Sequence, residues 1–475
     1  MADKYDLVVI GAGPAGEKGA AQAAYFGKRV LLVDPCARPG GIAVSTAGIP
    51  TKAVREGAIY LSGLGQSVHV APIGSQDPWG LLMARKREAS EMMTMAVERN
   101  LVRHGIERLQ GRARLLSPKR LEVEGAGGKR TVLDAEIVLL ACGSKPRHLP
   151  NIAMDDPDVH DCEDILEIAR APRSLLVIGS GPAGCEYASI FAALGTRVTI
   201  VGGSHPFPAV DAEMASVLAE SFNATGIRVM PVASVSGVAR TAGGLVVRLA
   251  DGGIEQVEKV LVVVGRRPHI EGLGLAEIGV EFDSAGWVRV DDHYQTTVAG
   301  VLAAGDVIGP PGLAAAAMEQ ARVAICHAFH FEFKYETDRF RPTYIFSIPE
   351  VASVGLTEEQ ARAADLDYEV GRCSFAANPK ARISGFPDGL VKLIFRANDK
   401  VLLGVHIVGE LASELIHVGQ FVMQVGGTID RFIDATFAVP SRSEAYKYAA
   451  YDGLQRLARR SVSKPNAVRA GTFLN

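Results

Sequence analysis

The sequence predicts an α/β protein that contains the same strand–turn–helix unit twice. The first copy is the apolar strand and glycine turn YDLVVIGAGPAG at 5–16, which runs into a helix of small residues, EKGAAQAAYFG. The second copy is LLVIGSGPAG at 175–184, followed by the helix CEYASIFAALG. A glycine turn between a strand and a helix is the phosphate-binding element of Rossmann-like domains. We therefore expect two such domains, each with a dinucleotide site.

The first unit has every feature that a dinucleotide site needs. In such a turn the first glycine allows a tight bend, the second lets a pyrophosphate approach the backbone, and the third lets the helix pack closely on the strand. The helix N-terminus then faces the phosphates. The next strand, VLLVD at 30–34, ends in Asp34, whose carboxylate can accept hydrogen bonds from ribose hydroxyls. The turn residues predicted to bind the cofactor are Gly11, Gly13, Pro14, Ala15 and Gly16.

The second unit differs from the first in one informative position. Its strand VTIV at 198–201 is followed by Gly202, where an acid would bind the 2′-hydroxyl of NAD and a nearby arginine would favour NADP. Gly202 does neither, and His205 is interpreted as a solvated loop residue. The sequence therefore leaves the choice between NAD and NADP open. The turn residues predicted to bind this nucleotide are Gly179, Gly181, Pro182 and Gly184.

Length and composition limit the other classes of function. A chain of 475 residues corresponds to about three domains. A formal net charge of -3 provides no field that would attract nucleic acid or an anionic membrane. The chain opens directly on a strand, without a leader pattern, and has no apolar run long enough for a membrane helix, so we expect a cytoplasmic protein. The six cysteines lack the spacing of a redox or zinc motif, and no metal site is predicted.

Four further motifs make the prediction more specific. They are GGIAVSTAGIPTKA at 40–53, LLACGSKP at 139–146, VVVGRRP at 262–268 and LAAGDVIG at 302–309. In order and spacing they resemble the flavoprotein disulfide reductase family, which includes dihydrolipoamide dehydrogenase, glutathione reductase and mercuric reductase. The resemblance implies FAD in the first unit and NAD(P)H in the second, with Asp306 holding the ribityl and pyrophosphate part of FAD. It adds four glycines to the cofactor-binding residues: Gly41, Gly143, Gly265 and Gly305.

The C-terminal part of the chain also resembles this family. The segments IPEVASVGLTEEQA at 348–361 and LGVHIVGELASELI at 403–416 are similar to its α+β interface domain, which implies a homodimer. The predicted domains are an FAD-binding domain at 1–150 and 273–338, an NAD(P)-binding domain at 151–272, a dimerisation domain at 339–460 and a tail at 461–475.

The chain departs from the family at the groups that handle thiols. Ala43 and Gly48 stand at the two cysteine positions of the redox motif, so no disulfide can form there. Val439 replaces the histidine of the C-terminal motif, and a valine cannot transfer a proton. Glu444 of that motif is retained and is interpreted as a dimer-interface or helix-capping group.

The nicotinamide half of the family's active site is retained. Lys52 matches the family lysine beside flavin N5, and Glu186 matches the glutamate that pairs with it. Such a pair can orient the nicotinamide and tune the flavin without entering the chemistry. We predict Lys52 and Glu186 as the catalytic residues, and a purely structural salt bridge is the alternative.

Three functions are compatible with this pattern. The segments IPTKAVRE, GDVIGPPGLAAAAMEQAR and FAVPSRSEAYKYAAYDGLQRL resemble the soluble NAD(P) transhydrogenase branch, which implies hydride transfer from NADPH through FAD to NAD, or the reverse. The first alternative is an NAD(P)H:quinone or dye reductase, with an apolar acceptor pocket made by Ala43, Gly48 and Val439. The second is a non-catalytic flavoprotein that acts as a sensor or scaffold. The sequence determines neither the electron acceptor, nor the direction of transfer, nor any assembly beyond a dimer.

Overall fold

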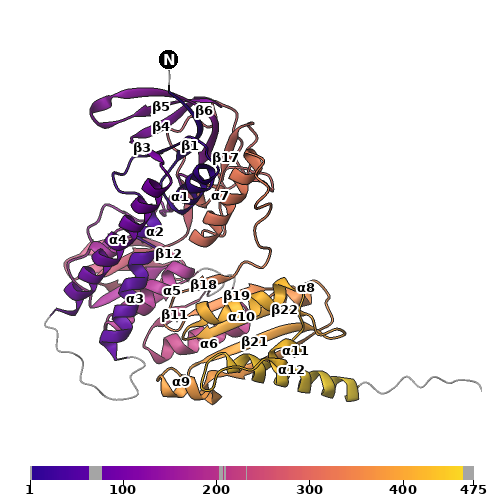
Figure 1. Cartoon of the computed structure of the whole chain (residues 1–475). Coiled ribbons are helices and arrows are strands. Elements are labelled where there is room, and N and C mark those ends of the chain that lie inside the picture. The colour runs from indigo at the N-terminus through magenta and orange to yellow at the C-terminus, as the bar shows by residue number, and fades with distance from the viewer. Residues whose placement is uncertain (1–2, 64–76, 203–206, 208–209, 232, 464–475) are drawn as a thin grey trace, which may run out of the picture. The chain divides into compact units, whose positions relative to one another are not determined.

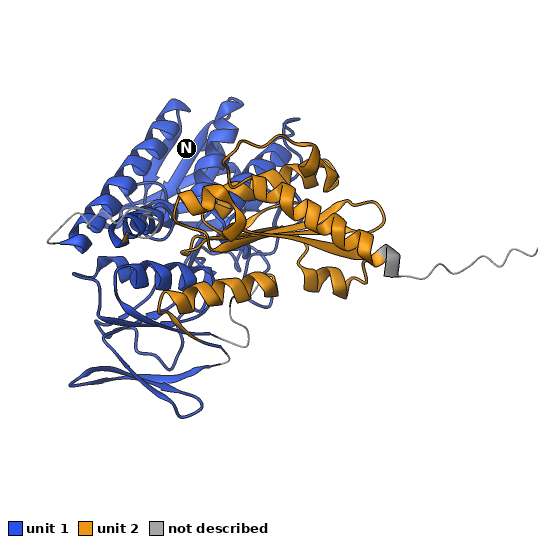
Figure 2. Ribbon diagram, turned by 90° about the horizontal axis from the view of Figure 1, so that it is seen from below, with its two compact units in different colours: residues 1–62, 73–206, 230–339 blue, residues 63–72, 207–229, 340–475 orange. Residues whose placement is uncertain are grey.

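The computed structural model describes residues 3–63, 77–202, 207, 210–231 and 233–463 (Figure 1). The chain divides into two compact units (Figure 2). Unit 1 comprises residues 1–62, 73–206 and 230–339, and unit 2 comprises residues 63–72, 207–229 and 340–475. The five-part division expected from the sequence stays a prediction.

The first sheet of unit 1 has seven strands in the order β3-β2-β1-β6-β5-β4, with β17 paired to β6. Strands β1, β2, β3, β6 and β17 are parallel, whereas β4 and β5 form antiparallel pairs. The strands are β1 (Asp3–Ile10), β2 (Val30–Asp34), β3 (Glu107–Gln110), β4 (Arg112–Ser117), β5 (Arg120–Glu124), β6 (Arg130–Leu140) and β17 (Val301–Ala303). The helices of this part are α1 (Pro14–Tyr25), α2 (Ile42–Ser45), α3 (Ile49–Ser62), α4 (Pro78–Arg103) and α7 (Ala314–Ala328).

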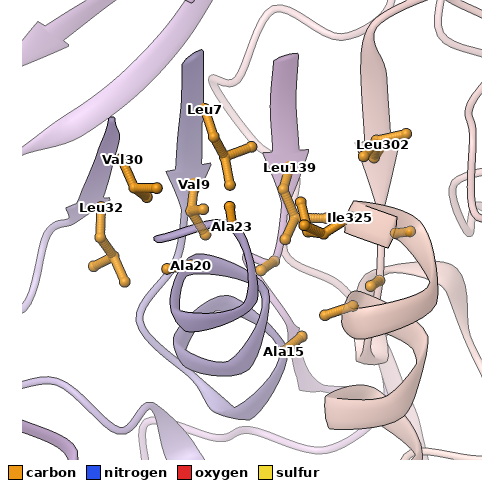
Figure 3. Close-up of a cluster of buried hydrophobic side chains, with 14 of the residues drawn as sticks. Leu7, Val9, Ala15, Ala20, Ala23, Val30, Leu32, Leu139, Leu302 and Ile325 are labelled. Atoms are coloured by element: carbon orange, nitrogen blue, oxygen red, sulfur yellow. The ribbon is translucent and has the colours of Figure 1, made fainter. Parts of the chain in front are cut away.

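Both faces of this sheet are buried, which explains the continuous apolar run of its central strand. Leu7 and Val9 of β1 pack into one core cluster together with Ala20 of α1 and Ile325 of α7 (Figure 3). Val8, from the same strand, belongs to a second cluster. Successive strand residues point to opposite faces, and parallel strands covered on both sides are therefore apolar throughout.

A second sheet has five strands in the order β11-β10-β9-β15-β8, of which β10, β9, β15 and β8 lie in unit 1. Its strands are β8 (Val159–His160), β9 (Ser174–Ile178), β10 (Arg197–Val201), β11 (Arg228–Met230) and β15 (Lys259–Val262), with α5 (Pro182–Ala193) after β9. A three-stranded antiparallel sheet is made by β12 (Val235–Thr241), β13 (Gly244–Leu249) and β14 (Ile254–Val257). A two-stranded antiparallel ribbon is made by β7 (Ser144–Pro146) and β16 (Arg266–Pro268). The 3-10 helices are η1 (Ala126–Gly128), η2 (Ile165–Glu167), η3 (Asp306–Ile308) and, in unit 2, η4 (Phe375–Ala377).

Unit 2 is built on a five-stranded antiparallel sheet in the order β18-β19-β22-β21-β20. Its strands are β18 (Thr343–Ile345), β19 (Val351–Gly355), β20 (Tyr368–Ser374), β21 (Gly389–Arg396) and β22 (Leu402–Gly409). Its helices are α6 (Ala212–Ala224), α8 (Glu358–Ala363), α9 (Pro379–Ile383), α10 (Ala412–Gln424), α11 (Asp430–Asp434) and α12 (Glu444–Ser463). Phe395, Phe432 and Tyr446 are fully buried in the core of this unit.

A buried ion cluster links α6 to the sheet of unit 2. The ammonium of Lys392, on β21, lies 2.9 Å from Asp211, 3.0 Å from Glu213 and 2.8 Å from Glu358. Asp211 also caps α6 by accepting hydrogen bonds from the backbone of its first turn. Arg372 forms a further ion pair with Glu213 at 2.7 Å. The cluster therefore holds α6 through its N-terminus.

The fold class expected from the sequence is confirmed, because the chain contains two sheets with parallel strands that lead into glycine turns and helices, and a second unit of the α+β type. Cys326 and His327 lie in α7, and His330 comes after the end of that helix with a positive φ of 57°. No helix in the described ranges combines the length and the apolar character that a membrane span requires.

Candidate active site

The residues of the first predicted site meet at one edge of the first sheet. In the register of the sheet, Ile10 at the end of β1 lies opposite Val33 of β2 and Leu140 of β6, and Leu140 lies opposite Ala303 of β17. All four strands are parallel, so their carboxyl ends lie together. Ligands of open α/β sheets bind at this edge. The predicted site residues that lie at or after these strand ends are Gly11, Gly13, Pro14, Ala15, Gly16, Asp34, Gly143, Gly305 and Asp306.

Close approaches of backbone make a cradle beside the first turn. A Cβ on Gly41 would lie 2.9 Å from the Cα of Gly13, and Gly41 has a positive φ of 60°. A Cβ on Gly11 would collide with the carbonyl of Ala141. Gly13 is the N-cap of α1 and offers no side-chain oxygen to the first helical N–H groups. These donors are therefore available to an anion, and the turn fits a pyrophosphate.

Asp34 is held in place by two backbone donors. Its Oδ2 accepts a hydrogen bond of 2.6 Å from the N–H of Ala12, and its Oδ1 accepts one of 2.7 Å from the N–H of Cys36. An ionised carboxylate has about four acceptor positions, so each oxygen keeps capacity for another donor. The structure thus orients Asp34 and leaves it able to accept hydrogen bonds from hydroxyl groups.

The second glycine turn repeats this geometry in the second sheet. A Cβ on Gly179 would collide with the carbonyl oxygen of Val263, and α5 begins at Pro182 with Gly181 as its N-cap. A Cβ on Gly184 would collide with the carbonyl oxygen of Gly179, which shows why the third glycine is needed. Gly265, with a positive φ of 105°, leads into β16.

A neighbouring side chain restricts the space at Gly202, the residue expected to influence the choice between NAD and NADP. Gly202 directly follows β10, and a Cβ there would lie 2.7 Å from the Oγ of the buried Ser180. An acidic side chain at this position therefore requires Ser180 to move. His205 lies outside the described residues.

Lys52 and Glu186 are brought together from two helices of unit 1. The Nζ of Lys52, on α3, donates a hydrogen bond of 2.8 Å to Oε2 of Glu186, on α5. The side chain of Lys52 is 30% exposed and that of Glu186 is 11% exposed. A pair with this exposure is less screened than a surface salt bridge. The contact is present as expected, and its role in hydride transfer stays a prediction.

Asp306 has partners that the sequence analysis did not identify. The hydroxyl of Ser144 donates a hydrogen bond of 2.8 Å to Oδ2 of Asp306. The same Ser144 oxygen accepts a hydrogen bond of 2.7 Å from Nε of Arg266. Both residues lie in motifs that were singled out, LLACGSKP and VVVGRRP, next to Gly143 and Gly265. The sequence offered one signal for these two residues: each stands next to a glycine that is predicted to bind a cofactor.

Position 48, one of the two positions expected to match the family's redox cysteines, has no space for a side chain. A Cβ on Gly48 would collide with the carbonyl oxygen of Ala43 and would lie 2.8 Å from its Cα. All six cysteines are free thiols. Burial raises the pKa of Cys142 to about 12 and that of Cys162 to about 11, so these two thiols are uncharged at neutral pH. Neither is a thiolate nucleophile.

The two C-terminal motif residues lie in unit 2. Val439 is 75% exposed. Glu444 is the first residue of α12, and its buried Oε2 has no hydrogen-bond partner among the described residues. Its interpretation as an interface or capping group stays a prediction, as does the acceptor pocket of Ala43, Gly48 and Val439. Within the described ranges, no group of three or more His, Cys, Asp or Glu side chains is arranged to hold a metal ion.

Comparison with known families matches this geometry to one class of enzyme. Residues 5–321 match the family model described as pyridine nucleotide-disulphide oxidoreductase, and residues 341–450 match the dimerisation domain of the same family. The chain belongs to this family. As a pyridine nucleotide oxidoreductase it has many relatives, and those named soluble pyridine nucleotide transhydrogenase are similar over nearly their whole length. The protein from Mycobacterium bovis (strain BCG / Pasteur 1173P2) is 36% identical over 460 residues, which cover 96% of this chain and 98% of the relative.

Other relatives and solved structures agree with this assignment. A soluble pyridine nucleotide transhydrogenase from Hahella chejuensis is 34% identical over 462 residues, covering 96% of this oxidoreductase and 99% of the relative. The crystal structure of LpdA from Mycobacterium tuberculosis matches with a TM-score of 0.87 at 28% identity, covering 94% of this chain and 99% of that chain. The HOCl-induced flavoprotein disulfide reductase RclA from Escherichia coli matches with a TM-score of 0.86 at 26% identity, with the same coverage.

Proposed function

We propose that this oxidoreductase is an FAD-dependent NAD(P) transhydrogenase, which catalyses NADPH + NAD⁺ → NADP⁺ + NADH or the reverse reaction. The observation that carries the proposal is the Lys52–Glu186 pair, which is in contact at 2.8 Å beside a redox motif that holds Ala43 and Gly48. A site that keeps the nicotinamide side and lacks the thiol side suits transfer between two nicotinamide nucleotides. The names and the near-complete coverage of the relatives support the same activity.

The first glycine turn and its surroundings would hold FAD. The N-terminus of α1 suits the pyrophosphate, Asp34 suits the ribose hydroxyls, and Asp306 suits the ribityl part. Gly41, Gly143 and Gly305 would allow the backbone to come close to the cofactor. When bound, FAD accepts a hydride from one nicotinamide nucleotide and donates it to another.

The protein's own groups would then position the nicotinamide nucleotides and stabilise the charges of the reaction. The second glycine turn binds NADPH and NAD⁺ in succession, and Gly202 offers no carboxylate that would repel a 2′-phosphate. Lys52 places a positive charge near the reacting ring, and Glu186 fixes the direction of its ammonium. Neither residue has to exchange a proton.

Anaerobic stopped-flow absorbance tests this function. The purified protein is reduced with NADPH and is then mixed separately with a thio-analogue of NAD and with a soluble quinone. We expect rapid reoxidation by the NAD analogue. Preferential reoxidation by the quinone would instead favour a small-acceptor reductase. No reoxidation by either compound would contradict both assignments.

We further propose a homodimer that acts in the cytoplasm. The match of residues 341–450 to a dimerisation domain supports the dimer. The word "soluble" in the names of the relatives supports the location.

A further inference from the structure

We propose that Arg266 is a positioning residue for the flavin cofactor, because it fixes the orientation of Asp306 through the hydroxyl of Ser144. The three residues come from three separate segments: Ser144 from β7, Arg266 from β16 and Asp306 from η3. The inference rests on the proposed function, since the orientation of Asp306 matters to FAD only if FAD binds beside it.

Counting donors fixes the direction of every hydrogen bond in this chain of contacts. The guanidinium of Arg266 can only donate, so its Nε, at 2.7 Å, must donate to Oγ of Ser144. The hydroxyl of Ser144 has a single hydrogen, and its contact with Asp306 Oδ2 at 2.8 Å uses that hydrogen. With Arg266 in place, the buried hydroxyl has its hydrogen directed at the carboxylate. Without Arg266, only the carboxylate itself would orient that hydroxyl.

Arg266 is itself held from three sides. A second nitrogen of its guanidinium donates to the backbone carbonyl of Ser144 at 2.9 Å and also to Glu163 at 2.9 Å. The third nitrogen donates to the sulfur of Cys162 at 3.3 Å. The backbone carbonyl of Cys162 accepts a hydrogen bond of 2.8 Å from the hydroxyl of Tyr187, which is on α5 next to Glu186. A planar guanidinium with this many contacts has one orientation.

The backbone at Asp306 is fixed independently, so only its carboxylate orientation is left to be set. Gly305 has a positive φ of 79°, and a Cβ there would lie 3.2 Å from the side chains of both Ala15 and Ala317. The N–H of Gly305 donates a hydrogen bond of 2.9 Å to Oε1 of Gln320. The hydrogen bond from Ser144 occupies Oδ2 of Asp306, which leaves Oδ1 as the better oriented acceptor for a cofactor hydroxyl.

The test measures the rate at which FAD leaves the full-length protein. The protein with its bound cofactor is diluted, and flavin fluorescence monitors the release. We expect Arg266→Met and Ser144→Ala each to release FAD about tenfold faster or more, since each removes a hydrogen bond of a charged network. Arg267→Met is the matched control. Arg267 is the next residue of β16, and its exposed side chain pairs with Glu271 on the surface. The control should release FAD at the wild-type rate.

A double-mutant cycle separates positioning from a general structural effect. If Arg266 acts through Ser144, Arg266→Met should have less than about a twofold effect in a Ser144→Ala background, because coupled residues are not additive. The same change should have its full effect in the wild-type background. Equal effects in both backgrounds would overturn the proposal, as would release rates of Ser144→Ala and Arg266→Met that match the control.

Two controls keep the test decisive. Thermal unfolding of each variant shows whether that variant folds. Ser144→Ala removes one oxygen without deleting a charge. This variant therefore tests the same link if Arg266→Met does not fold. A wild-type protein that is purified without FAD and cannot take it up would overturn the proposed function and this inference together. Tight FAD binding that is insensitive to Ser144 would overturn the inference alone.

Discussion

Lys52 and Glu186 are 134 positions apart in the sequence, yet their charged atoms lie 2.8 Å apart. Helices α3 and α5 each contribute one of the two residues. A charge in this place acts on a hydride transfer by electrostatics and by orientation, which are effects of preorganised groups. The role that we propose for the pair can therefore be separated from folding by a measurement of flavin reduction.

Lys52→Ala should slow the reduction of the flavin by NADPH by about tenfold or more and should leave FAD bound, because one preorganised charge is lost. Anaerobic stopped-flow absorbance measures the reduction, and the visible flavin spectrum measures the bound cofactor. Lys400→Ala is the control, since Lys400 forms a comparable ion pair with Asp430 at 2.9 Å in unit 2. Reduction of the Lys52 variant at the wild-type rate would make the pair a structural salt bridge.

Gly48→Ala should destabilise the protein, because a Cβ at position 48 would collide with the backbone of Ala43. Overpacking of this kind costs about 1–3 kcal/mol, which lowers the midpoint of thermal unfolding. Gly237→Ala is the control, since a Cβ there would have its nearest neighbour at 4.0 Å. An unchanged unfolding midpoint for Gly48→Ala would refute the steric argument.

The same collision predicts that Ala43→Cys combined with Gly48→Cys does not create a disulfide reductase.

Helix α6 depends on a buried charge cluster rather than on apolar contacts alone. Burial by itself would raise the pKa of Asp211, but the hydrogen bond from Lys392 and the other nearby donors and charges outweigh it and lower that pKa. The same balance of burial against donated hydrogen bonds lowers the pKa values of Glu213 and Glu358. All three carboxyls are therefore ionised at neutral pH and depend on the lysine.

Lys392→Met should destabilise unit 2 by about 3–5 kcal/mol, since removing one partner leaves buried carboxylates without their cation. Urea unfolding at neutral pH measures this loss. Lys400→Met is the matched control, because its ion pair with Asp430 is partly exposed and is worth about 1 kcal/mol or less. A deficit no larger than that of the control would show that the cluster does not hold α6.

The pH dependence of this cluster has a defined sign. The folded-state pKa values of the three carboxyls lie below their unfolded values of about 4. Their contribution to stability is therefore complete above those unfolded values and is lost as the pH falls through the folded values. In the Lys392→Met variant the carboxyls gain from protonation, so the stability difference from wild type should narrow between neutral pH and about pH 4. A difference that widens on acidification would contradict this account.

At the scale of the whole molecule, the family match divides the chain into a nucleotide-binding part at 5–321 and a dimerisation part at 341–450. We expect sedimentation equilibrium to give twice the mass of one chain over the micromolar range, as obligate dimers of large interface do. A single-chain mass at every concentration would contradict the proposed dimer. The same samples, with their flavin content measured, show whether dimerisation and cofactor binding go together.

The sequence by itself determined the local elements of the two nucleotide sites. Strand, glycine turn and helix are contiguous in each unit, and a Cβ on Gly16 would collide with the carbonyl oxygen of Gly11, a near neighbour in the chain. That Ala43 and Gly48 carry no thiol is also visible without a structure.

Only the tertiary structure decided which distant groups meet. The chain of contacts from Arg266 through Ser144 to Asp306 depends on the pairing of β7 with β16 and on the place where β17 ends. The anchoring of α6 depends on Lys392 from a strand 181 positions away from Asp211. Strand register and helix packing set these distances, and no local pattern encodes them, because the free energy that selects them is that of the packed core as a whole.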